Sequence, residues 1–298
     1  MKIYFIFILV SLLAINSAQA QEGSDIYLGK LNFWDKQAVS DLIQVTNSAD
    51  YTNQPYFFGH DKLYFTQAVK RDEVDQTDIF VYDIMSKKVT NVTQSSESEY
   101  SPTPLAKGVG MSVIRVNSEG KQELWSLSAK GKPVKHLVPA VEPVGYQVWL
   151  NENELLLFVL GEPHTLQRVD IENENAEGIE IDSTIGASLY QFENSDWFLY
   201  SQTEKGNKLK AYNRRTNKTL VVTDMPEGSQ YFSVSVTGHI ITSDGTSLYQ
   251  RKLVAKGERL EAQESWKLMP ILNEKCQSGI SRTSISHHGG MIALVCPH

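Results

Sequence analysis

Short runs of alternating apolar and polar residues dominate the chain, and turn residues separate them at regular intervals. One such run recurs six times, with central apolar residues Ile26, Ile79, Leu124, Leu166, Leu209 and Leu248. The steps between these residues are 53, 45, 42, 43 and 39 positions. A period of roughly 40 to 45 residues built from short strands is typical of the blades of a β-propeller. The pattern therefore predicts an all-β ring of six blades.

Each recurring run belongs to a larger unit of four β-rich pieces. A polar turn and a second piece follow it, and two further pieces complete the unit, the last of them strongly apolar. The connections are rich in Gly, Asn, Asp and Ser, as hairpin turns require. Helical periodicity is nearly absent, although residues 36–43 and 257–268 are compatible with short helices, which we expect as insertions between strands. The unit predicts four antiparallel strands per blade.

The order of the pieces predicts how the ring closes. If the inner strand of each blade comes first, the chain starts with the third and fourth strands of a blade, at residues 25–31 and 42–46. It ends with the first and second strands, at residues 279–286 and 291–296. Joining these pieces in one blade removes the exposed sheet edges that an open ring would leave. We expect residues 21–298 to form this single domain.

The N-terminus has the pattern of a secretory signal peptide. Lys2 precedes an apolar run over residues 3–15, and the segment ends in Ala18-Gln19-Ala20. We expect residues 1–20 to be cleaved between Ala20 and Gln21, leaving a soluble chain without an integral membrane segment. The expected location is periplasmic or secreted. Cys276 and Cys296 are the only two cysteines, and an exported chain favours a disulfide between them, with two buried thiols as the alternative.

Charge narrows the classes of partner. The formal net charge is −7, which argues against binding nucleic acid through its phosphates. No nucleophile elbow, zinc-binding helix motif, phosphate-binding loop, paired-cysteine motif or calcium loop occurs. We therefore assign no catalytic residue, no metal ligand and no cofactor from the sequence.

Several segments resemble the repeat of TolB-like propellers, a six-bladed, WD-repeat-like family of exported bacterial proteins. The third and fourth strands of that repeat are similar to Asp78-Ile79-Phe80-Val81-Tyr82-Asp83 and to residues 89–93, and its Ser-Pro-rich inner strand to Tyr100-Ser101-Pro102. The family's Ser-Pro-Asp-Gly turn has diverged to Phe58-Gly59-His60-Asp61 and His288-Gly289-Gly290. The resemblance implies the fold over the whole mature chain, whereas the fold serves many functions.

Candidate ligand-binding residues come from the loops that enter the inner strands. Each such loop offers one carboxylate: Asp50, Glu99, Glu142, Asp182, Glu227 and Glu274. A ring of carboxylates at the channel mouth would attract a cation or a basic partner, whereas the plainer interpretation is solvated loop charge. Tyr51, Tyr100, Tyr146 and Tyr231 open four inner strands, where packing between blades is favoured over ligand stacking.

Other groups fall on the opposite face. Loops joining third and fourth strands are mostly basic, which suggests peripheral association with an anionic surface or simple solvation. Four histidines, His60, His239, His287 and His288, fall in turns between first and second strands. They would bind a transition metal only if they converged, which adjacent histidines seldom do.

Two functions remain open from the sequence. The first is a non-enzymatic binding scaffold that recognises a protein, peptide or small ligand on its loops, with a partner in the cell envelope. The alternative is a hydrolase or lyase whose carboxylate-lined site, with or without a metal, lies at the channel mouth. Convergence of three or more of the six acids at the axis would favour the enzyme.

Overall fold

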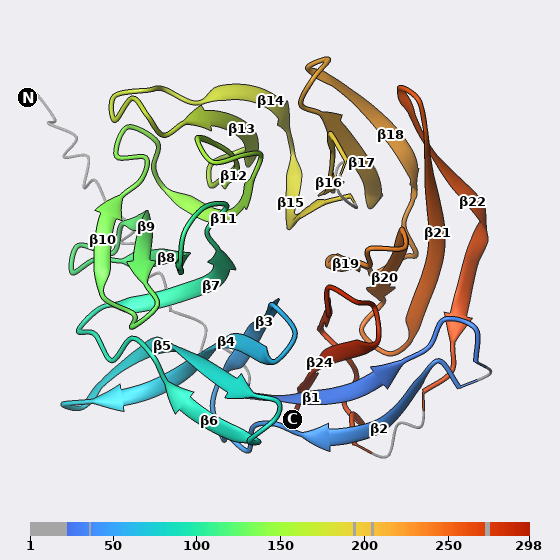
Figure 1. Ribbon diagram of the computed structural model, residues 1–298, viewed down its shortest axis with the longest axis horizontal. Coiled ribbons are helices and arrows are strands. Elements are labelled where there is room, and N and C mark those ends of the chain that lie inside the picture. The colour runs from blue at the N-terminus through green and yellow to red at the C-terminus, as the bar shows by residue number, and fades with distance from the viewer. Residues whose placement is uncertain (1–22, 36, 193–194, 204–205, 272–274) are drawn as a thin grey trace, which may run out of the picture.

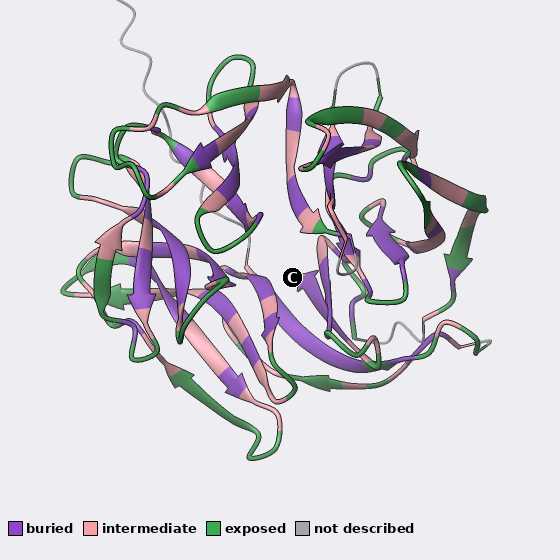
Figure 2. Ribbon diagram, turned by 45° about the horizontal axis from the view of Figure 1, so that its top comes forward, coloured by how far each residue is buried: buried purple, intermediate pink, exposed green. Residues whose placement is uncertain are grey.

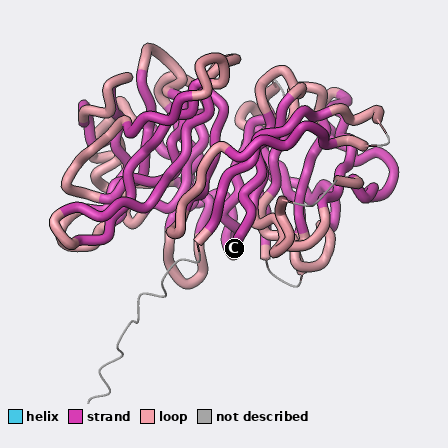
Figure 3. The backbone as a smooth tube through the Cα atoms, turned by 90° about the horizontal axis from the view of Figure 1, so that it is seen from below, coloured by secondary structure: helices cyan, strands magenta, loops and turns pink. Residues whose placement is uncertain are grey.

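The computed structural model describes residues 23–35, 37–192, 195–203, 206–271 and 275–298. Its secondary structure is all β, with no helix in these ranges, and the loops gather at the two faces of the ring (Figure 3). Six four-stranded antiparallel sheets surround a central axis (Figure 1). The predicted signal peptide over residues 1–20, with its cleavage site at Ala20 and Gln21, lies outside the described residues.

Five blades are continuous in sequence, each with its first strand innermost. Blade one holds β3 (Thr52–Phe58), β4 (Lys62–Arg71), β5 (Val74–Asp83) and β6 (Lys88–Asn91). Blade two holds β7 (Ser98–Pro104), β8 (Gly110–Val116), β9 (Gln122–Ser128) and β10 (Pro133–His136). Blade three holds β11 (Val144–Trp149), β12 (Glu154–Val159), β13 (Thr165–Asp170) and β14 (Ile179–Ser183). Blade four holds β15 (Ile185–Gln191), β16 (Trp197–Gln202), β17 (Lys208–Asn213) and β18 (Lys218–Asp224). Blade five holds β19 (Phe232–Val234), β20 (His239–Ser243), β21 (Leu248–Lys256) and β22 (Arg259–Met269).

The closing blade joins the two ends of the chain, as predicted. Its strands are β23 (Arg282–Ile285), β24 (Met291–Pro297), β1 (Ser24–Leu31) and β2 (Val39–Gln44), in that order from the axis outward. Register pairs Asp25 with Cys296 and Lys30 with Met291. Cys296 also forms a disulfide with Cys276, with 5.1 Å between the Cα atoms. This bond ties the segment before β23 to β24.

Two details of the sequence interpretation are wrong. Residues 257–268 fall mostly in β22, and residues 36–43 contain most of β2, so neither is a helical insertion. Both segments are outer strands whose residues are largely exposed. Their apolar positions are sparse because only one side of an outer strand is covered, and sparse apolar spacing over a few residues fits a helix as well as a strand.

The hydrophobic core lies between the blades. Six buried clusters each draw side chains from two neighbouring blades. In one of them Val148 and Leu156 of blade three pack with Leu189 and Tyr200 of blade four. The inner and middle strands are buried and the outer strands are exposed (Figure 2). Every blade is therefore stabilised through its neighbours.

Candidate functional site

The first strands of the six blades meet around the axis and line a cavity of about 60 Å³. At least one residue of every first strand lines its wall, from β3, β7, β11, β15, β19 and β23. We call the face with the loops before these strands the loop face, and the face with the turns after them the hairpin face. The cavity lies toward the loop face, since Tyr231 and Arg282 stand at the beginnings of their strands.

Bulges in the inner strands shape this cavity. The register shifts between Asn53 and Tyr56 in β3, and between Tyr100 and Thr103 in β7. Within these bulges Gln54 and Ser101 adopt left-handed backbone conformations, with φ of 55° and 56°. A bulge redirects side chains and is common beside functional sites. Here the redirected residues form part of the cavity wall.

Arg282 and three tyrosines form the polar centre of the site, which we call the arginine–tyrosine cluster: Arg282, Tyr51, Tyr146 and Tyr231. Arg282 Nη2 donates to the Tyr146 hydroxyl at 3.0 Å. The guanidinium carbon lies 3.8 Å from the ring centroid of Tyr231, a close cation–π contact. The Nε of Arg282 is buried and donates to no atom of the described residues.

The charge of Arg282 governs the ionisation of its neighbours. Burial alone would raise the pKa of Tyr146, but the positive charge of Arg282 and the hydrogen bonds from Arg282 and Gln54 outweigh it, so the pKa lies below its ordinary value. Burial raises the pKa of Tyr51 and of Tyr231, and the charge of Arg282 offsets this only in part. Tyr146 is thus the hydroxyl that carries most of the interaction with the guanidinium.

Two buried amides hold the cavity wall rigid across blade boundaries. The side-chain oxygen Oε1 of Gln54 accepts a hydrogen bond from Thr66 Oγ1 at 2.8 Å and another from the backbone N–H of Ser101 at 2.9 Å. Gln147 Nε2 lies 3.1 Å from the carbonyl oxygen of Ser101 and 3.3 Å from Thr103 Oγ1. These hydrogen bonds connect blades one, two and three, while Gln147 Oε1 is buried without a hydrogen-bond partner among the described residues.

A second and wider compartment continues toward the hairpin face. It has a volume of about 250 Å³ and shares Tyr56, Thr103 and Tyr190 with the first cavity. We call it the vestibule. Its wall comes from the ends of the inner strands and is mixed, with apolar Phe57, Pro104, Val148, Trp149, Val234 and Ile285 beside polar Thr103, Gln191, Ser235, Ser284 and His287. No aspartate or glutamate among the described residues lines either compartment.

The carboxylates singled out from the sequence lie elsewhere. Glu99 is inside β7 and only 1% exposed, with Oε1 3.5 Å from Arg115 Nε. Asp182 is in β14, where it pairs with Lys210 and accepts a hydrogen bond from the Tyr200 hydroxyl. Glu99 is thus bound within blade two, whereas Asp182 of blade three is bound by residues of blade four.

The remaining four differ in their surroundings. Asp50 and Glu227 are exposed in loops that precede inner strands, as expected. Glu142 Oε1 lies 3.4 Å from His136 Nε2. Together with Glu123 these residues form a group whose possible metal-ligand atoms all lie within 4.8 Å of one another. Glu123 is already hydrogen-bonded by Trp125 at 2.7 Å and Asn117 at 2.7 Å, so this group is held by protein donors. Glu274 lies outside the described residues.

The turn histidines converge only as a pair. His60 and His288 stack with ring centroids 3.8 Å apart and Nε2 atoms 3.3 Å apart, whereas His287 meets His288 edge-on at 5.7 Å. His239 is remote from this pair in its contacts, because its ring stacks on Phe33 at 4.1 Å. The 3.3 Å between the Nε2 atoms of His60 and His288 is a hydrogen-bond distance, and the tautomers decide which nitrogen donates.

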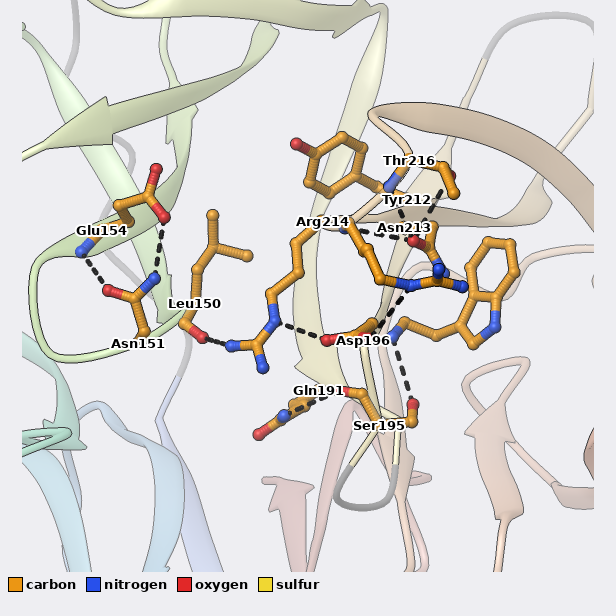
Figure 4. A network of polar contacts seen from close by, with 12 residues as sticks. Leu150, Asn151, Glu154, Gln191, Ser195, Asp196, Tyr212, Asn213, Arg214 and Thr216 are labelled. Carbon is orange, nitrogen blue, oxygen red and sulfur yellow. Dashed lines mark hydrogen bonds and ion pairs between the residues drawn. The ribbon is translucent and has the colours of Figure 1, made fainter. Parts of the chain in front are cut away.

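The basic loops include residues with structural partners. Arg214, in the turn after β17, donates to Asp196 Oδ1 at 2.7 Å and reaches the carbonyl oxygen of Leu150 in blade three (Figure 4). Arg215 lies 3.3 Å from Glu258 of blade five. These arginines connect neighbouring blades, so part of the basic charge of this face is used in holding the ring together.

Sequence reasoning missed Arg282 and placed the tyrosines differently. Tyr146 and Tyr231 line the axial cavity. Packing between blades was the favoured expectation, and Tyr100 and Tyr146 do pack against clusters between blades. The sequence does show an arginine, Arg282, at the start of the inner strand of the closing blade, where four other blades have a tyrosine near the same position. That this position lies at the axis becomes clear only once the ring is closed.

Comparisons with solved structures agree on the fold. TolB of Agrobacterium tumefaciens superposes with a TM-score of 0.64 and 9% identity, covering 93% of this chain and 99% of that one. TolB of Acinetobacter baumannii gives 0.52 and 12%, covering 91% of this chain and 63% of that one, so this chain spans less than two thirds of it. A gluconolactonase from Xanthomonas campestris gives 0.56 and 11%, covering 83% and 86%. The chain therefore has the TolB-like propeller fold.

Sequence comparison adds nothing to this result. No family model matches the chain, and no curated protein matches it. The apolar segments give no helix in the described residues that could span a membrane.

Proposed function

We propose that this protein is an exported binding propeller that holds a protein, peptide or small ligand at its central channel. The observation that carries the proposal is the axial cavity, in which Arg282 faces neutral side chains from neighbouring blades. Pockets with a few convergent polar groups and otherwise apolar walls are the usual form of a ligand site. The likeness to solved TolB structures supports a binding role.

The proposed compartment is the periplasm or the medium, with a partner in the cell envelope. The signal-like N-terminus motivates this proposal, and the disulfide between Cys276 and Cys296 suits an oxidising compartment. We further propose that the exposed acids Asp50 and Glu227 contribute to recognition at the loop face, as two of the six loop carboxylates.

The enzymatic alternative is a hydrolase or lyase at the channel mouth. Likeness to a gluconolactonase keeps it open at the level of fold. Such chemistry requires carboxylates or another base near the reacting atoms. Of the six loop acids, Glu99 lies beside Arg115 of its own blade and Asp182 pairs with Lys210 of the neighbouring blade, and neither lines the axial cavity or the vestibule.

Filling the cavity tests the binding proposal. Ala187 lines the cavity, so Ala187→Phe should block it, whereas Ala140→Phe in an exposed loop should not. Mature protein and both variants would be used in pull-downs from envelope extract and analysed by native mass spectrometry for co-purified small molecules. We expect a partner or ligand that the wild type and Ala140→Phe retain and Ala187→Phe loses.

Two outcomes would count against the proposal. One is that no molecule is retained by any form, and the other is that Ala187→Phe retains it fully while folding normally. The same pull-down with Asp50→Lys and Glu227→Lys tests the loop carboxylates. Both substitutions should weaken the binding of a partner that uses the loop face. Hydrolysis of a lactone panel, abolished by Ala187→Phe, would favour the enzymatic alternative.

A further inference from the structure

The channel holds a positive charge without a negative partner. Arg282 forms no ion pair with an aspartate or glutamate in the described part of the chain, and its neighbours in the cavity wall are hydroxyls, amides and aromatic rings. A guanidinium stays protonated when buried, because its pKa lies far above neutral pH. Hydroxyls and ring faces solvate the charge but do not neutralise it, and an uncompensated buried charge is costly. The cluster is therefore suited to an anion.

The shape of the channel narrows the kind of anion. The cavity beside Arg282, of about 60 Å³, has room for a small group and not for a whole ligand. The vestibule, of about 250 Å³, lies next to it, and Tyr56, Thr103 and Tyr190 line both compartments. Its wall includes Phe57, Trp149 and Ile285. One compartment is thus narrow and cationic, and its neighbour is wider, with aromatic and aliphatic side chains over part of its wall.

We propose that the channel binds a ligand with a carboxylate head and an apolar body, with the head on Arg282 and the body in the vestibule. This inference rests on the proposed binding function and gives its ligand class. Arginine is well suited to carboxylates because its planar fork can donate two parallel hydrogen bonds. A free carboxylic acid and the C-terminus of a peptide with an apolar last residue share this chemistry.

Matched acids and amides test the proposal. The probes are 4-phenylbutyrate with 4-phenylbutyramide, and acetyl-Gly-Gly-Phe with a free or an amidated C-terminus. Isothermal titration calorimetry in low-chloride buffer would measure their affinities for the mature protein. We expect each acid that binds to do so at least ~10-fold more tightly than its amide, the size of a charged hydrogen bond of about 1.5 kcal/mol or more. Binding of only one pair identifies the source as a small acid or as a peptide terminus.

Variants connect the preference to Arg282. Arg282→Gln should remove the preference for acids, and Arg282→Lys should retain only part of it because the fork is lost. Arg259→Gln, at an exposed position of the outer strand β22, is the matched control and should bind as the wild type does. If Arg282→Gln does not fold, Tyr146→Phe, which removes the hydroxyl that Arg282 contacts at 3.0 Å, should still change acid affinity while amide affinity stays constant.

Several results would overturn the inference. They are equal affinity for acid and amide, absence of binding by all four probes, or tyrosinate absorbance at neutral pH that disappears in Tyr146→Phe, since a phenolate would already neutralise Arg282. Failure of this inference is distinguishable from failure of the proposed function. If Ala187→Phe abolishes capture of a partner and no acid binds, the binding function stands and the carboxylate inference falls.

Discussion

Glu99 shows how the interior treats a single charge at the residue scale. It is 1% exposed, and burial raises its pKa to about 7, with a further increase from nearby Asp78 and decreases from the Ser95 hydroxyl and Arg115. Its ordinary pKa is 4.5. Between these values the folded protein keeps a proton that the unfolded chain has released. The free energy of unfolding must therefore fall as pH rises through this window.

Replacing Glu99 by glutamine should remove this dependence. Wild type should lose up to about 3 kcal/mol relative to Glu99→Gln between pH 4.5 and 7, as measured by urea unfolding. Glu97→Gln is the control, because Glu97 also contacts Arg115, at 2.8 Å, but is partly exposed. Parallel pH profiles of wild type and Glu99→Gln would show that Glu99 does not titrate in this window.

His239 should give the opposite slope. Burial and the charge of Lys252 lower its pKa to about 4, from an ordinary value of 6.5. Below pH 6.5 the unfolded chain gains a proton that the folded protein does not bind, so stability is lost as pH falls toward 4. The loss should reach about 3 kcal/mol and be absent in His239→Asn. Titration of the ring protons by NMR is the direct measurement, and a midpoint near 6.5 would contradict the assignment.

Residue roles were predictable only where they were local. Cys276 and Cys296 stand out by number and position, and the structure joins them. By contrast, Arg282 interacts with Tyr146, 136 positions away, and nothing in the local sequence of either residue indicates the other. The loop carboxylates were chosen by position before each inner strand, but Asp182 and Glu99 lie within strands, beside Lys210 and Arg115.

At the scale of the strand, two blades have an equivalent hydrogen bond between their third and fourth strands. The backbone N–H of Ile26 donates to Thr46 Oγ1 at 2.9 Å, and that of Ile79 donates to Thr93 Oγ1 at 3.0 Å. The closing blade and blade one therefore each use a threonine at the equivalent position to join the third and fourth strands. Outer strands such as β22 were harder to predict, because they face solvent and need little apolar pattern.

Gly131 marks a close approach between two blades. Its φ is +71°, and a Cβ atom there would lie 2.4 Å from the carbonyl oxygen of Val92 in blade one. Gly120, with φ of +80°, has no atom within 4 Å of that point. Gly131→Ala should destabilise the protein by about 2 to 4 kcal/mol, and Gly120→Ala by only about 1 kcal/mol from backbone strain. Thermal unfolding of both variants is the measurement. Equal losses of stability would mean that the close approach at Gly131 does not limit the size of the side chain there.

At the scale of the whole molecule, the ring depends on its shared blade. β1 pairs with β24 along seven residues, and buried side chains of β1 join two of the clusters between blades. Deleting residues 21–47 should therefore abolish cooperative unfolding of the entire domain. Calorimetry would measure this, with the missing segment added back as a peptide as the control, which should restore part of the transition. A truncated protein that melts as the full one does would refute the closure.

The global architecture was the most predictable level. Six copies of one pattern specify six blades, and the order of pieces at the two ends specifies which strands share a blade. What occupies the axis was not predictable. It depends on bulges at Gln54 and Ser101, which shift register by a residue and are invisible in an alternating pattern.

The shared blade also orders events in time. β1 is synthesised among the first strands, yet its partner β24 is among the last, and long-range pairing of this kind is slow. A growing chain can complete blades one to five in turn but cannot seal the ring before its final residues are available. Until then β1 presents an unpaired edge, which is a hazard for association with other chains. A chaperone that acts on this protein would have most to do at that last step.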